Sequence, residues 1–75
     1  MSVHFKSQSE RYVHRGKFLA MHFEKKMPYA KIAEITGKSP TRVGQLVREG
    51  WLLVEQGRLQ IKDGKVQLRN GKEVI

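Results

Sequence analysis

The chain has 75 residues, which is enough for a single domain, 1–75, and too short for two. It contains no cysteine, so disulfides, thiolate zinc sites and a cysteine nucleophile are excluded. Fifteen lysines and arginines stand against seven aspartates and glutamates, and the formal net charge of +8 favours a polyanionic partner such as nucleic acid.

Composition divides the chain into a helical part, 7–50, and a part with strand and turn patterns, 51–75, after an N-terminal segment, 1–6, that we expect to be disordered. The first helix should be capped by Ser7 or Ser9 and run toward Met27, because apolar side chains recur there at helical spacing. These side chains are Tyr12, Phe18, Leu19, Ala20, Phe23 and Met27. Gly16 should weaken this helix or delay its start, and Pro28 should end it.

A second helix is predicted from Tyr29 to about Thr36, since Pro28 suits the first turn of a helix. Its inner face should hold Ile32 and Ala33, with Ile35 as a further candidate. Gly37 then follows as a left-handed residue that caps the helix.

The third helix should start after Ser39, which can cap it, with Pro40 in the first helical position. It should run to Glu49, and Gly50 should stop it. Its buried side chains are expected to be Val43, Leu46 and Val47. Trp51, just past the end, is expected in the core that joins the sheet to the helices, in preference to a stacking platform for single strands.

Three turn dipeptides, Gln56-Gly57, Asp63-Gly64 and Asn70-Gly71, predict a four-stranded antiparallel meander with two-residue loops. The register would pair Val54 with Leu59, Leu52 with Ile61, Ile61 with Val66, Leu59 with Leu68 and Val66 with Ile75. All seven of these apolar residues then share one face, with Glu73 opposite Leu68. The other face would carry Arg58, Lys62, Lys65, Arg69 and Lys72. A simpler alternative needs only the central hairpin, Arg58 to Arg69.

The stretch from Tyr29 to Arg48 resembles the helix-turn-helix of DNA-binding regulators. Ala33 supplies the small residue where two helices touch and Gly37 the turn four residues later, with Val43 and Leu46 at the apolar positions six and nine residues further on. The continuation into Trp51-Leu52 and a hairpin is similar to winged helix-turn-helix families, among them phage excisionases and small transcription regulators. The resemblance implies an α+β fold, a three-helix helix-turn-helix core followed by a short antiparallel hairpin or meander.

The same resemblance implies that the third helix lies in the major groove of double-stranded DNA. Its outward residues would be Ser39, Thr41, Arg42, Gln45 and Arg48. Arginine can read guanine and glutamine can read adenine, whereas Ser39 and Thr41 suit phosphate oxygens. Gly44 should weaken this helix by about 1 kcal/mol relative to alanine, and would allow its backbone to approach a phosphate. Alternatively, these polar residues form an ordinary solvated face.

Lys62 and Lys65, at the tip of the hairpin, would contact the DNA backbone or the minor groove as a wing. The alternative is that these lysines protect an exposed strand from aggregation.

Catalytic chemistry is not expected, and neither is a metal or another cofactor. His4, His14 and His22 are the only histidines, and the last two are about 12 Å apart along a helix, too far for one ion. The carboxylates form no close pair that suggests acid–base work. No stretch approaches the about 20 apolar residues of a membrane span, and no signal peptide is recognisable, so we expect a cytoplasmic protein without a membrane partner.

Three functions remain open from sequence. The first is regulation of transcription on double-stranded DNA in a bacterium or a phage-infected cell. The second is a protein contact, for example with host RNA polymerase, because a fold does not determine its function. The third is RNA binding, since Leu46-Val-Arg-Glu-Gly50 followed by strands resembles an RNA-binding fold of ribosomal proteins. The oligomeric state is left open.

Overall fold

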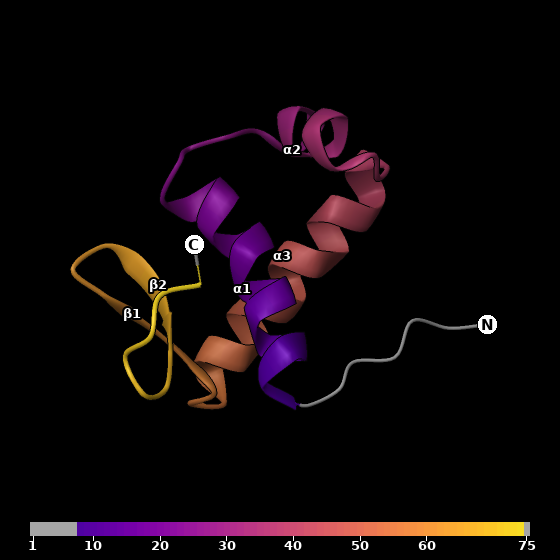
Figure 1. The fold of residues 1–75 in the computed structure, drawn as a ribbon. Helices are drawn as coiled ribbons and strands as arrows, with labels where there is room; N and C mark the ends of the chain where they lie inside the picture. Colours follow the sequence, from indigo (N-terminus) through magenta and orange to yellow (C-terminus); the bar gives the residue numbers. More distant parts are fainter. Residues whose placement is uncertain (1–7, 75) are drawn as a thin grey trace.

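A computed structural model describes residues 8–74. Within this range the chain forms the helices α1 (Gln8–Phe23), α2 (Tyr29–Thr36) and α3 (Pro40–Glu55), and then the strands β1 (Leu59–Lys62) and β2 (Lys65–Leu68) (Figure 1). The expected α+β layout, with helices first and an antiparallel hairpin after them, is confirmed. The segment 1–6, expected to be disordered, lies outside the described residues.

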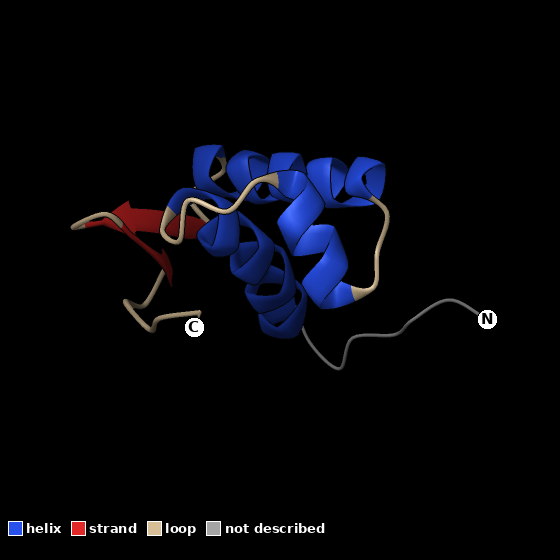
Figure 2. Cartoon of the chain, turned by 90° about the horizontal axis from the view of Figure 1, so that it is seen from above, coloured by secondary structure: helices blue, strands red, loops and turns tan. Residues whose placement is uncertain are grey.

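The core joins all five elements. Fully buried side chains come from α1 (Leu19), α2 (Ile32), α3 (Leu46), β1 (Leu59) and β2 (Val66). Seen from above, α3 lies along one side of the molecule, with α1 and α2 packed against its inner side and the hairpin beyond its C-terminal end (Figure 2). No described helix is both long enough and apolar enough to cross a membrane.

The predicted second helix and the start of the third are confirmed. Gly37 has a φ of 75° and donates its N–H to the Ala33 carbonyl at 2.9 Å, which ends α2. Ser39 caps α3, because its Oγ accepts the Arg42 N–H at 3.1 Å, and Pro40 is the first helical residue. The burial expected on α2 and α3 is also confirmed, for Ile32, Ala33, Val43, Leu46 and Val47. Ile35 is 57% exposed, so its assignment to the inner face is wrong.

The predicted stop at Gly50 is wrong, because α3 continues to Glu55. Gly50 is instead a contact point: a Cβ atom there would lie 2.9 Å from the Leu19 Cβ and 3.0 Å from the Arg15 carbonyl oxygen of α1. The helical part therefore extends beyond the predicted boundary at 50, and Leu52 and Val54 are helical rather than on a first strand. Leu52 is 47% exposed, contrary to its predicted place in the core.

Helix α1 also differs from its prediction at two points. Gly16 neither interrupts it nor begins it; a Cβ at Gly16 would lie 2.9 Å from Cγ1 of Val74, so glycine here admits the C-terminal segment. The helix ends at Phe23, before the predicted end at Met27. At this end the Lys25 N–H donates to the Ala20 carbonyl at 3.1 Å.

The central hairpin has the predicted register, with Leu59 opposite Leu68 and Ile61 opposite Val66. Asp63 and Gly64 in its turn have φ values of 54° and 75°, as a two-residue hairpin loop requires. The meander is wrong: the described sheet has two strands, and the pairings predicted for Leu52 and Val54 do not exist.

The C-terminal turn is wider than predicted. The Leu68 N–H bonds to the Lys72 carbonyl at 2.7 Å, and a single bridge joins Gln67 to Glu73, one residue away from the expected register. Val74 is consequently buried against α1. The pairing predicted for Ile75 lies outside the described residues.

Trp51 lies on α3 with 39% of its surface exposed, so its predicted position in the core is wrong. Its ring meets that of Phe23 edge to face, with centroids 5.6 Å apart.

Candidate nucleic-acid interface

The outward face of α3 is the first candidate site. Thr41, Gln45, Arg48 and Leu52 recur at helical spacing and are all exposed, whereas Val43, Leu46, Val47 and Gly50 are buried on the opposite side. We call these four exposed residues the α3 stripe. Figure 2 shows the other elements on the inner side of α3 or beyond its end. The stripe is therefore open to a partner along most of the helix.

Arg42, beside the stripe, forms a hydrogen-bonded pair with Gln45 of the stripe. The Arg42 Nη1 donates to the Gln45 Oε1 at 3.2 Å, and both side chains are exposed. Because the Gln45 oxygen accepts this bond, the pair offers its remaining N–H groups, which are all donors. Such a group matches the two acceptors of guanine, O6 and N7, or a phosphate. For Gln45 to read adenine with both amide atoms, its Oε1 would have to turn from Arg42.

The hydroxyl groups of Ser39 and Thr41 differ in how they could bind a phosphate oxygen. The Ser39 oxygen already accepts the Arg42 N–H, so this residue first holds the start of α3, and its hydroxyl proton remains for a phosphate oxygen. Thr41 is exposed on the stripe.

Positive charge gathers where α1 approaches the start of α3. Burial lowers the pKa of His14 below its usual value of 6.5, and the charges of Arg15, Lys38, Arg42 and Lys17 lower it further. His14 Nδ1 is 2.8 Å from Arg15 Nη1, and its ring lies against Phe18. Lys17, on α1, and Lys38, just before α3, are both exposed. Lys38 was not among the predicted site residues, although it directly precedes the cap residue Ser39.

The hairpin lysines form a second, separate group. Lys62 and Lys65 are exposed and directly opposite each other, and Lys65 Nζ lies 3.5 Å from Glu73 Oε1. The hairpin follows the C-terminal end of α3, whereas the predicted α3 contacts lie within residues 39–48 near its start (Figure 1). The structure therefore does not bring the two groups together.

Gly44 is explained by packing against α2. A Cβ atom at this position would lie 3.3 Å from Cε2 of Tyr29. The Tyr29 ring in turn lies against the His22 ring, with centroids 4.7 Å apart and the ring planes tilted by 45°. The space next to Gly44 is thus occupied by Tyr29, contrary to the suggestion that a phosphate could approach the backbone here.

The charge of α3 itself is balanced, because Arg42 and Arg48 are matched by Glu49 and Glu55. The net charge of +8 therefore resides in other parts of the chain.

Among residues 8–74, no three His, Cys, Asp or Glu side chains are grouped so that they could hold a metal ion.

No protein-family model, curated protein or solved structure matches this chain.

Proposed function

We propose that this chain binds double-stranded DNA with the α3 stripe in the major groove, and that it regulates transcription in a bacterium or a phage-infected cell. The observation that carries the proposal is the open stripe of Thr41, Gln45 and Arg48, next to the donor pair of Arg42 and Gln45, on a capped and well-packed helix. An α-helix fits the major groove, and donor side chains there can distinguish guanine from the other bases.

The order of elements supports the same proposal. A short helix, a glycine turn and a longer helix are followed at once by a hairpin, which is the order of a winged helix-turn-helix, and we propose that assignment for the fold. In this arrangement Lys38 and Thr41 would contact phosphates next to the bases read by Arg42 and Gln45. Lys62 and Lys65 would contact the backbone further along the duplex.

Selection from random duplex DNA, followed by affinity measurements on the enriched sequence, tests the proposal. We expect Arg42→Ala and Gln45→Ala each to lose about 1–3 kcal/mol on that sequence and little on random duplex, since base contacts carry the discrimination. Lys25→Ala is the control, because it removes an exposed basic side chain that lies just beyond the C-terminal end of α1 and outside the α3 stripe. Absence of duplex binding by the unmodified chain would overturn the proposal.

A protein partner, such as RNA polymerase, is the second candidate. Tyr29, Ile35, Trp51 and Leu52 are exposed on α2 and α3, and large apolar side chains of this kind are typical of protein interfaces. A pull-down from bacterial lysate with the unmodified chain and with Trp51→Ala tests it. Polymerase subunits that are retained only by the unmodified chain, together with no enriched DNA sequence, would favour this candidate.

A further inference from the structure

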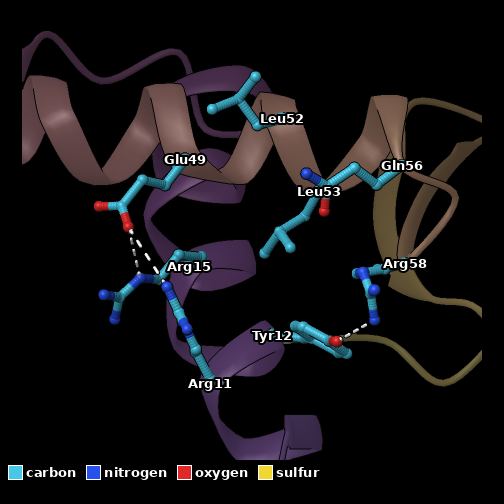
Figure 3. Close-up of a pocket in the computed structure, with 8 residues that line it drawn as sticks. All are labelled: Arg11, Tyr12, Arg15, Glu49, Leu52, Leu53, Gln56 and Arg58. Atoms are coloured by element: carbon cyan, nitrogen blue, oxygen red, sulfur yellow. Dashed lines mark hydrogen bonds and ion pairs between the residues drawn. The ribbon is translucent and has the colours of Figure 1, made fainter.

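A pocket of about 340 Å³ lies between the N-terminal half of α1, the C-terminal half of α3 and the residue that precedes β1 (Figure 3). Three guanidinium groups line it, those of Arg11, Arg15 and Arg58, together with the Tyr12 hydroxyl. Glu49 is the one carboxylate among its lining residues. Arg11, Arg15 and Tyr12 are not recognisable as binding residues from their positions in the sequence, because they converge only when α1 crosses α3.

The pocket carries an excess of positive charge. Glu49 Oε1 lies 3.5 Å from Arg15 Nε and 4.0 Å from Arg11 Nη2, so one carboxylate is shared by two guanidinium groups. Arg58, on the other side, binds the neutral Tyr12 rather than a carboxylate within residues 8–74. The three arginines and the one glutamate give the lining residues a formal net charge of +2.

Two of the three guanidinium groups, those of Arg58 and Arg15, are held by other side chains before any ligand arrives. Arg58 donates a hydrogen bond from Nη1 to the Tyr12 hydroxyl, and its guanidinium lies 5.5 Å from the centre of the Tyr12 ring. The Arg15 side chain is only 10% exposed and is fixed against Glu49. Because these side chains are already ordered, an anion would bind without much of the usual entropic cost.

We propose that this pocket binds a phosphate of the DNA strand that borders the major groove occupied by α3. The proposal rests on the proposed function, and Leu52 connects the two, since it belongs both to the α3 stripe and to the pocket lining. A backbone that follows α3 past Arg48 would place a sugar on the exposed Leu52 and the adjoining phosphate between Arg11 and Arg58. Guanidinium groups bind phosphate oxygens in a bidentate way.

The charge distribution supports a role in affinity rather than in sequence reading. Helix α3 has no net charge, so attraction to the duplex must come from neighbouring elements. The pocket supplies two positive charges directly next to the stripe. A phosphate contact of this kind strengthens binding to every sequence alike.

Salt-dependent binding of the full chain to the selected duplex and to random duplex tests the pocket. We expect Arg58→Gln and Arg11→Gln each to weaken binding to both duplexes and to reduce the salt slope by about 0.9 per lost phosphate contact. Tyr12→Phe should have a smaller effect in the same direction, because it releases Arg58 without removing its charge. Lys25→Gln serves as the control, because it also removes one positive charge, but just beyond the C-terminal end of α1 and away from the pocket. Thermal melting verifies that each variant is folded.

One outcome is that the unmodified chain binds the duplex while Arg58→Gln and Arg11→Gln have the same salt slope as Lys25→Gln. That result would overturn the pocket proposal and leave the proposed function intact. A second measurement does not depend on duplex binding. Inorganic pyrophosphate should shift the side-chain N–H resonances of Arg11 and Arg58 together with the ring proton resonances of Tyr12, which lies in the same pocket. The Tyr12 shifts should disappear in the double variant Arg11→Gln, Arg58→Gln, which retains Tyr12 and Glu49. If an oligoglutamate of equal charge shifts these resonances more strongly, the pocket is suited to an acidic protein, and the phosphate proposal fails.

Discussion

Gly50 of α3 lies so close to Leu19 of α1 that a Cβ atom at position 50 would be 2.9 Å from the Leu19 Cβ. The Arg15 carbonyl oxygen, at 3.0 Å, blocks the same space with rigid backbone. This contact sets how closely the two long helices approach, and through it the positions of Arg15 and Glu49, whose ion pair spans the same helices.

Gly50→Ala should therefore lower the free energy of unfolding by about 1–3 kcal/mol, because overpacking outweighs the better helix propensity of alanine. Chemical denaturation measures this change. Gly44→Ala is the comparison, since its Cβ would meet only the movable Tyr29 ring at 3.3 Å, and it should stay within about 1 kcal/mol of the unmodified chain. Equal stability of Gly50→Ala and the unmodified chain would contradict this account of the helix contact.

Leu46 is fully buried between the helices, so Leu46→Ala should cost about 2–5 kcal/mol through lost burial and the cavity left behind. Leu52→Ala removes the same atoms from an exposed site of the same helix and should cost less than about 0.5 kcal/mol. Denaturant midpoints compare the two variants directly. Similar losses for both would show that the division of α3 into an inner and an outer face is wrong.

Glu24 connects the end of α1 to the hairpin, because its Oε2 accepts the N–H of the buried Val66 at 2.7 Å. Glu24→Ala leaves this N–H without its acceptor and should cost about 1–3 kcal/mol. Hydrogen exchange at the Val66 amide should accelerate at the same time. Glu24→Gln keeps an acceptor oxygen, so it should recover part of the loss; an unchanged exchange rate in Glu24→Ala would argue against the connection.

The lowered pKa of His14 predicts how stability depends on pH. The folded chain binds this proton less readily than the unfolded chain, so His14 contributes stability above the ordinary pKa of 6.5. That contribution should be lost as the pH falls through the lower pKa of the folded state. Denaturation at pH values from about 5 to 8 measures it, with His14→Gln as a variant that lacks the titration. The same pH dependence in His14→Gln would assign the effect to another group.

Binding of duplex DNA should raise the pKa of His14, because phosphates near Lys38 and Arg42 would offset the positive charges that lower it. The histidine ring proton resonances, followed with pH in the free and the bound chain, report this shift. Affinity for the duplex should accordingly increase as the pH falls through the pKa that His14 has in the bound chain. A pKa of His14 that is identical with and without saturating duplex would place the DNA away from the start of α3.

Residue order alone was sufficient for the turn between α2 and α3 and for the central hairpin, because both depend on neighbours in the chain. Gly37, Ser39 and Pro40 determine the turn between α2 and α3 through their own backbone and capping preferences. Asp63-Gly64 sets the register of the hairpin, because both residues can adopt positive φ. The exposed residues of α3 near its start follow from the same helical period that buries Val43 and Leu46.

Tertiary structure decided the features that depend on residues distant in the chain. A glycine can end a helix or allow a neighbouring helix to approach closely. Gly50 allows a close approach, and this is evident only from its contact with Leu19, which lies 31 positions earlier in the chain. Once α3 continues through Gly50, Leu52 and Val54 are helical, and the meander loses its first strand. The pocket of Arg11, Arg15 and Arg58 arises from the same crossing of α1 and α3, because close packing at a glycine brings side chains from three segments around one space.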